Sequence, residues 1–213
     1  AHDTQGSSVW QVYDINAGTL SSDPGENAGF TAVGSVIYFD ASDSSAGREL
    51  WAHDAATGST WRVVDIYGCS SGSYPGFRAG LAVVDSTLYF DAYTTTGGRE
   101  LWAYETTTDS TWQVADINST GSSGPGALAN FTVVGTRIYF DADDGINGRE
   151  LWVLETTDGS TWQVADINAN GHSDIAKHGS ILSFGSRLYF DATDGGSGCE
   201  LWTLEIEHSI TYN

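Results

Sequence analysis

Short apolar and aromatic stretches recur along the whole chain, separated by polar segments rich in glycine, serine, threonine and aspartate. The stretches are enriched in β-branched and aromatic residues, and turn-forming residues bound them, which is typical of antiparallel hairpins. No apolar period of 3.6 residues extends far enough to predict a helix. The pattern therefore predicts an all-β protein.

One unit occurs four times in the sequence. Its Gly-Arg-Glu-Leu-Trp segment begins at Gly47, Gly98 and Gly148, and it returns at Gly198 with Cys199 in place of arginine. Tyr-Phe-Asp-Ala begins at positions 38, 89, 139 and 189, and Trp-x-Val-x-Asp-Ile begins at positions 10, 61, 112 and 162. Each unit predicts four short strands, and a four-stranded repeat of about 50 residues is typical of a propeller blade.

The phase of the repeats indicates how the array ends. The chain opens with the last strand of a unit, residues 9–15, and finishes with the first three strands of another. We expect the opening strand to complete the last sheet, because a closed ring has no exposed sheet edges. The sequence thus predicts one domain, residues 1–213, forming a four-bladed β-propeller with blades at about 30–66, 81–117, 131–167, and 181–205 plus 9–15. An open β-solenoid with capped ends is the alternative.

The segment from Glu49 to Ile66 resembles the ELWxxDGT repeat of large secreted bacterial proteins, and the likeness covers all four units. It is similar, more loosely, to kelch-type propeller repeats. Two features depart from the pattern, namely segments such as Thr108-Asp109-Ser110 in place of Asp-Gly-Thr, and Cys199 in place of the repeated arginine. The resemblance implies a secreted propeller and no particular activity, because a fold does not define a function.

Composition narrows the partners and the compartment. With 28 acidic and 8 basic residues, the net charge of −20 disfavours nucleic acid and anionic membranes as partners. No apolar run of about 18 residues is present, so no membrane insertion is expected. The chain lacks methionine and begins at Ala1, which suggests a removed signal peptide and secretion. Cys69 and Cys199 could form a disulfide in an oxidising compartment or remain free thiols.

The long loops between units, which we call the linking loops, and the loops after Tyr-Phe-Asp-Ala are expected on one face of the array. Long loops on a rigid scaffold are common ligand sites. In the second unit several loop residues depart from the repeat: Tyr67, Tyr74, Phe77, Arg78 and Tyr93. Aromatic faces beside polar groups suit a sugar, which presents both apolar ring faces and hydroxyls.

Carboxylates cluster in the loops after Tyr-Phe-Asp-Ala. The third and fourth units place six oxygen-bearing side chains there: Asp141, Asp143, Asp144, Asn147, Asp191 and Asp194. Such oxygen-rich turns suit Ca²⁺. Alternatively, the first aspartate pairs across the hairpin with the repeated arginine and the others form turns. The second unit lacks the additional carboxylates, which favours this alternative.

The fourth linking loop differs from the others because it carries His172, Asp174 and His178 where they carry proline. Two imidazoles and a carboxylate could bind Zn²⁺ or Cu²⁺, although histidines in polar loops are commonly solvated. The terminal Ala1-His2-Asp3 segment is a weaker copper candidate.

Motifs of catalysis are missing from the sequence, which has no Gly-x-Ser-x-Gly segment and no reactive-cysteine signature. We therefore expect a binding protein and not an enzyme. The sequence predicts an extracellular carbohydrate-binding module, assisted by Ca²⁺. The alternatives are a metal or small-ligand carrier that uses the central channel or the His172 loop, and an adhesion module that binds protein.

Overall fold

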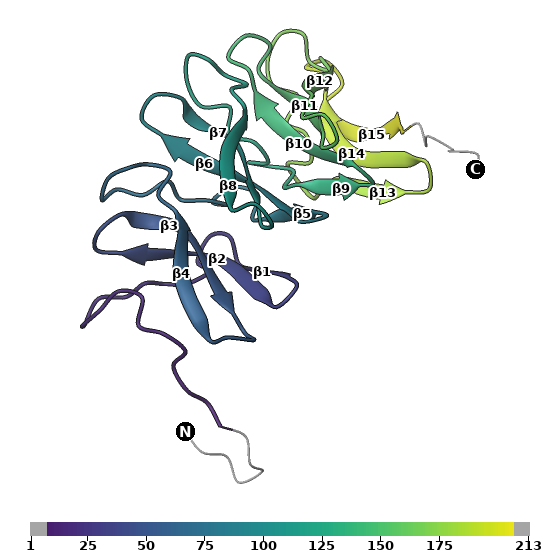
Figure 1. Ribbon diagram of the computed structural model, residues 1–213. Helices are drawn as coiled ribbons and strands as arrows, with labels where there is room; N and C mark the ends of the chain where they lie inside the picture. The colour runs from purple at the N-terminus through teal and green to yellow at the C-terminus, as the bar shows by residue number, and fades with distance from the viewer. Residues whose placement is uncertain (1–7, 207–213) are drawn as a thin grey trace.

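The computed structural model describes residues 8–206, and its strands form four antiparallel sheets (Figure 1). The first sheet contains β1 (Phe30–Val33), β2 (Val36–Asp43), β3 (Gly47–Asp54) and β4 (Ser59–Val64). The second contains β5 (Ala82–Val84), β6 (Thr87–Thr94), β7 (Gly98–Glu105) and β8 (Ser110–Ala115). The third contains β9 (Thr132–Val134), β10 (Arg137–Asp143), β11 (Arg149–Glu155) and β12 (Thr161–Ala165). The fourth contains β13 (Leu182–Phe184), β14 (Arg187–Thr193) and β15 (Cys199–Glu205). The prediction of an all-β chain built from repeated sheets is confirmed.

The repeated motifs fix the register of each central hairpin. In the first sheet, Phe39 lies opposite Trp51 and Asp40 lies opposite Leu50. The same pairing recurs in the other three sheets, because the motifs occur at the same spacing. The arginine or cysteine that follows the glycine at the start of the third strand therefore lies close to the motif aspartate of the second strand.

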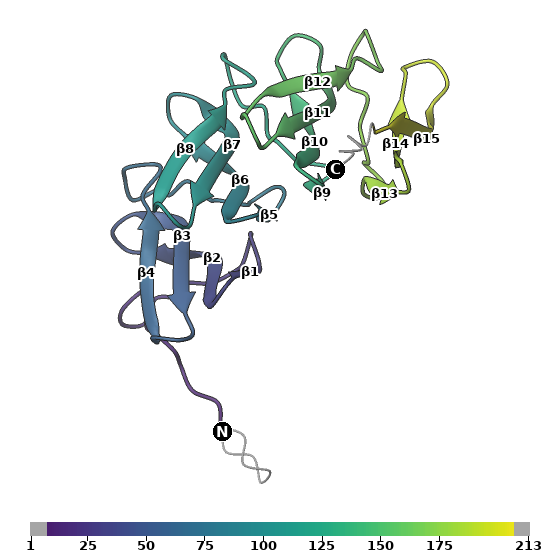
Figure 2. The same cartoon turned by 45° about the vertical axis from the view of Figure 1, so that its right-hand side comes forward.

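The hydrophobic core lies between consecutive sheets. Leu50 of the first sheet packs with Leu88 and Phe90 of the second, and Leu101 of the second packs with Phe140 of the third. Figure 2 shows the sheets following one another along an arc, with the short strands β1, β5, β9 and β13 on its concave side. Each sheet thus buries a face wherever it meets a neighbouring sheet, as in other repeat proteins. No helix long and apolar enough to cross a bilayer occurs among the described residues.

The array is open in this structure, so the expected ring closure is not observed. Residues 9–15 form no strand, and the fourth sheet has the three strands β13, β14 and β15 alone. Figures 1 and 2 show the N-terminal segment leading away from the first sheet, with the fourth sheet at the far end of the arc. Leu201 is consequently 77% exposed, whereas its counterpart Leu101 is fully buried. Within residues 8–206, core clusters between neighbouring sheets hold the arc together.

Candidate functional site

An aspartate–arginine pair anchors the loop before each of the first three sheets. The buried Asp40 accepts hydrogen bonds from the backbone N–H groups of Asn27 and Ala28, and Arg48 contacts it at 2.6 Å. The equivalent pairs are Asp91–Arg99 and Asp141–Arg149, both at 2.5 Å. The alternative expectation for these aspartates, a pair across the hairpin, is therefore what the structure shows. Asp141 is engaged by Arg149 and by loop amides, and its assignment as a calcium ligand stays a prediction.

In the first three sheets, the glutamate of the Glu-Leu-Trp segment ties the sheet to the following loop. Glu100 accepts hydrogen bonds from the Ser123 backbone N–H and hydroxyl at 2.7 and 2.6 Å, and from the Ile117 N–H at 2.9 Å. Glu49 makes the same contacts with Ser73 and Ile66. Burial raises the pKa of Glu100 above its ordinary value, although the Ser123 hydrogen bonds oppose this shift. The sequence did not predict this role, because the glutamate recurs in every unit and its position in the repeat does not show whether its side chain is buried.

A cavity of about 360 Å³ lies between the second and third sheets, on the face that carries the linking loops. We call it the second-sheet groove. Its lining residues are Arg78, Tyr93, Arg99, Ser122, Gly124, Ala127, Leu128 and Arg149. Arg99 and Arg149 were not predicted as site residues, because they occupy a position that is repeated and so gave no signal of a local site.

The structure brings together all five residues that the sequence singled out in the second unit. Tyr67 stacks on Tyr93 with ring centroids 5.7 Å apart, and the Phe77 ring meets Tyr74 edge-on at 6.4 Å. The Arg78 guanidinium lies 5.2 Å from the centre of the Phe77 ring. Tyr74, Phe77 and Tyr93 remain exposed. Tyr93 therefore presents an accessible aromatic face to the groove, and Phe77 contacts Arg78, which also lines it.

The charge of the groove is locally positive in an acidic protein. Arg99 and Arg149 are each paired with an aspartate, so their charges are compensated. Within residues 8–206, no carboxylate oxygen lies within 4.0 Å of the Arg78 guanidinium. Arg78 therefore provides one uncompensated positive charge at the wall of the groove.

The acidic loops of the third and fourth sheets form turns. Asp144 accepts hydrogen bonds from the Ile146 and Asn147 N–H groups, and Asp143 accepts one from the Gly145 N–H. In the fourth sheet, the N–H groups of Ser197 and Gly196 lower the pKa of Asp194.

The calcium expectation concerned Asp141, Asp143, Asp144, Asn147, Asp191 and Asp194. Among the described residues, carboxylates alone form no group of three metal-ligating atoms within 4.8 Å of one another. Calcium binding stays a prediction.

The three predicted ligands of the fourth linking loop do not converge. His172 Nδ1 accepts a hydrogen bond from the Arg149 N–H at 2.8 Å, and Asp174 pairs with Lys177 at 2.7 Å. His172 instead borders a hollow of about 480 Å³ beside Asp143. His178 points to a different partner, Asp191. The other copper candidate, residues 1–3, lies outside the described residues.

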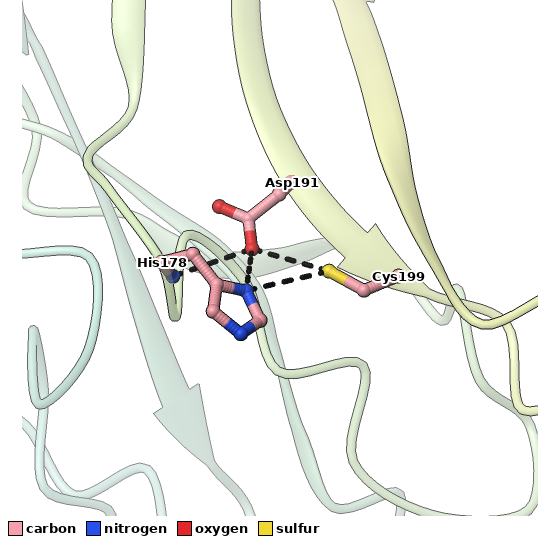
Figure 3. Close-up of side chains that lie close together, drawn as sticks. All are labelled: His178, Asp191 and Cys199. Carbon is pink, nitrogen blue, oxygen red and sulfur yellow. Dashed lines mark hydrogen bonds and ion pairs between the residues drawn. The ribbon is translucent and has the colours of Figure 1, made fainter.

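His178, Asp191 and Cys199 form a group that we call the fourth-sheet cluster (Figure 3). Asp191 Oδ2 lies 2.9 Å from His178 Nδ1 and 3.2 Å from Cys199 Sγ, and the sulfur lies 3.6 Å from the same Nδ1. The hydrogen bond to Asp191 raises the pKa of the Cys199 thiol, and burial adds to the shift. A catalytic relay would need the sulfur and the carboxylate on different imidazole nitrogens. Figure 3 shows both beside Nδ1, so the geometry does not match a nucleophile activated by histidine.

Of the two alternatives for the cysteines, the structure shows free thiols, since Cys69 and Cys199 are both unpaired and exposed. Cys69 lies in the loop between β4 and β5, whereas Cys199 begins β15, and the third sheet separates these elements along the arc (Figure 2). A disulfide requires Cα atoms within about 7 Å. The cysteines therefore give no support to an oxidising compartment, and secretion stays a prediction.

No family model and no curated protein matches the chain. Among solved structures it is similar to a TolB from Agrobacterium tumefaciens, with a TM-score of 0.53 and 11% identity over 90% of this chain and 64% of that one. It is also similar to a puromycin hydrolase solved in complex with PGG, with a TM-score of 0.55 and 15% identity over 89% of this chain. The chain spans only 27% of the length of that hydrolase. At these identities the likeness shows the fold alone, which is a propeller-like array of four antiparallel sheets.

Proposed function

We propose that the protein is a carbohydrate-binding module that holds its ligand in the second-sheet groove. The observation that carries the proposal is a cavity of about 360 Å³ lined by Tyr93 and by three guanidinium groups, those of Arg78, Arg99 and Arg149. Tyr67 stacks on Tyr93, and Phe77 packs against Arg78. Small-molecule pockets begin at about 300 Å³. An exposed aromatic face packs on the apolar face of a pyranose ring, while planar guanidinium groups donate to its hydroxyls.

Arg78 adds a preference among sugars. A guanidinium without a carboxylate partner binds an oxyanion through paired N–H donors. A sugar that carries a carboxylate would therefore bind more tightly than its neutral counterpart. The acidic surface elsewhere repels the same ligand, so an acidic sugar would be directed to this groove.

The test is a glycan array that contains neutral and uronate oligosaccharides, run in calcium buffer and again with EDTA, followed by calorimetry on the sugars that bind. We expect Tyr93→Ala to weaken binding about tenfold, which corresponds to about 1.4 kcal/mol. Arg78→Gln should reduce the affinity for uronates and leave neutral sugars nearly unchanged. Loss of binding in EDTA would add calcium to the site.

Arg187→Gln is the matched control, because it removes the same charge at the opposite end of a sheet, where β14 begins. It should leave the affinity unchanged. Absence of glycan binding in both buffers would refute the proposal and favour the carrier or adhesion alternatives. Equal losses from Arg78→Gln and Arg187→Gln would show that only the overall charge matters.

We also propose that the ring closes in solution through residues 9–15 on β15. Ile15 packs beside Phe39 and Ala41 of the first sheet, as Ile66 packs beside the corresponding residues of the second. The Ser22 carbonyl accepts the Ser42 N–H, which is the bond that recurs in the later linking loops. The loop before the first sheet thus makes the same contacts with its sheet as the later linking loops, each of which follows a preceding sheet.

Each end of the array also exposes side chains whose counterparts in the other sheets are more buried. Glu200 is exposed on β15, where Glu100 is buried against Ser123 and Ile117 at the equivalent place. Trp10 is 72% exposed on the segment that would supply the fourth strand. Closure would bury both ends and place the four loop faces around one axis.

A further inference from the structure

The fourth-sheet cluster stands where the other three sheets have an aspartate–arginine pair. Asp191 occupies the position of Asp40, Asp91 and Asp141. Cys199 replaces the arginine, and His178 occupies the loop position that Leu128 has in the third sheet. The fourth sheet therefore lacks the guanidinium charge that compensates the motif aspartate elsewhere. Two side chains that commonly bind metals converge on the aspartate in its place.

The distances in the cluster are close to those of a metal site. The three ligand atoms are separated by 2.9, 3.2 and 3.6 Å. Metal bonds of about 2.0–2.3 Å put tetrahedral ligand atoms about 3.3–3.8 Å apart. A small outward movement of the exposed His178 and Cys199 side chains would turn these contacts into metal bonds. Figure 3 shows all three side chains directed at a common point beside Asp191.

We propose that His178, Asp191 and Cys199 bind one Zn²⁺ ion per chain. The combination of imidazole nitrogen, carboxylate oxygen and sulfur suits zinc, whereas Ca²⁺ takes oxygen ligands. When zinc binds, the thiol proton leaves to solvent and a zinc–sulfur bond replaces the sulfur–hydrogen bond. The thiolate and the carboxylate then balance the charge of the ion. The fourth position on the metal is open to water.

The ion would perform the role that arginine has in the other sheets. In the first sheet, Arg48 joins Asp40 of β2 to the backbone of the preceding loop at Asp23. Zinc would join the linking loop, through His178, to β14 and β15, through Asp191 and Cys199. Binding to the folded state alone stabilises it, so Zn²⁺ should raise the melting temperature.

The first measurement is a titration of the reduced full chain with Co²⁺, which reports a thiolate ligand by charge-transfer absorption in the near ultraviolet. We expect this band to saturate at one equivalent and to disappear when Zn²⁺ is added. Calorimetry with Zn²⁺ should give one site per chain. Both readouts are independent of any ligand in the second-sheet groove, so failure of one proposal leaves the other intact.

Two variants copy the sequence of another sheet and are therefore expected to fold. Cys199→Arg restores the arginine, and His178→Leu introduces the residue of the third sheet. Cys199→Arg should abolish the cobalt band, and His178→Leu should abolish binding or shift the band. Both variants keep His2 and His172, so these histidines cannot account for the loss. Cys69→Ser and His172→Ala are the controls, and both should bind as the wild type does.

Three outcomes would overturn the zinc proposal. The first is a wild-type chain that shows no thiolate band with Co²⁺. The second is a band that persists in Cys199→Arg, which would assign the thiolate to Cys69. The third is a band that is lost in Cys69→Ser, which would show a metal bound between chains or between the two cysteines.

Discussion

At the scale of single residues, the same aspartate has different surroundings in different sheets. Asp40 is fully buried beside Arg48, whereas Asp191 is partly exposed beside His178 and Cys199. A buried carboxylate requires a compensating charge or hydrogen bonds, because the interior solvates it poorly. The arginine is therefore a structural partner in the first three sheets. Asp191 is less buried than Asp40, so it has less need of a compensating charge.

Breaking the buried pair of the first sheet should destabilise the protein strongly. Arg48→Ala leaves Asp40 buried without its partner, and we expect a loss of about 3–5 kcal/mol in the free energy of unfolding. Arg62→Ala is the control, because Arg62 is more exposed and pairs with Asp43 near the surface. It should cost about 0–1 kcal/mol. Urea denaturation followed by tryptophan fluorescence measures both, and equal losses would contradict the structural role of the buried pair.

Glu105 gives a prediction on pH. The Thr107 backbone N–H and neighbouring hydroxyls lower its pKa to about 2. Because the folded pKa lies below the unfolded value, its stabilisation is present above about pH 4.5 and is lost as the pH falls towards 2. Glu105→Gln should therefore melt at a lower temperature than the wild type at pH 7. The difference should shrink towards zero near pH 2, and a difference that is constant with pH would be the contrary result.

At the scale of elements, the glycine that begins β7 has two constraints. Gly98 has a φ of +68°, and a Cβ there would collide with the Gly121 carbonyl oxygen and with the Ser122 hydroxyl. The contact arises because the linking loop crosses directly over the start of the strand. Gly47 and Gly148 have similar contacts with their own linking loops. The glycine of each Gly-Arg-Glu-Leu-Trp segment is thus required by the close approach of two backbones.

Replacing this glycine by alanine, beside a control glycine, should separate the cost of the left-handed backbone from the cost of the steric clash. Gly98→Ala adds a left-handed alanine, costing about 1–2 kcal/mol, and a steric clash, costing about 1–3 kcal/mol more. Gly58→Ala is the control, because Gly58 has a φ of +75° and no atom within 4 Å of the added Cβ. It should show the first cost alone. Denaturation midpoints compare the two variants, and equal midpoints would show that the loop moves aside freely.

At the scale of the whole molecule, the two ends of the arc decide whether the ring closes. Glu100→Ala removes the acceptor for Ser123 and Ile117, so buried donors lose their partners at a cost of about 1–3 kcal/mol each. In a closed ring, Glu200→Ala should cost nearly as much. In an open array Glu200 is exposed, and its loss should stay within about 0.5 kcal/mol. Denaturation of both variants tests the proposed closure.

Sedimentation velocity accompanies that comparison and locates the closing strand. A monomer with a large effect of Glu200→Ala indicates closure within one chain. A dimer with the same effect indicates that residues 9–15 pair with β15 of a second copy. A monomer without the effect would refute closure.

Much of the fold could be predicted because it repeats. Phe39, Asp40, Leu50 and their counterparts recur at fixed spacing, so the hairpins and their register follow from periodicity. The groove was predicted in part, since Tyr93 and Arg78 depart from the repeat. Its other wall, Arg149, belongs to the next sheet, and only the packing of two sheets brings it there. The sequence grouped His178 with His172 and Asp174, whereas the structure places His178 beside Asp191 of β14 and Cys199 of β15.

The sequence by itself determined the β-sheet class, the four units and the strands of the four observed sheets, because local turn chemistry and periodicity act over a few residues. It also marked the fourth unit as different at Cys199 and His178. The tertiary structure decided which side chains meet across sheets, which carboxylates are buried, and that the cysteines remain apart. These three features depend on contacts between residues that are far apart along the chain, and no local sequence pattern specifies the distances between such residues in space.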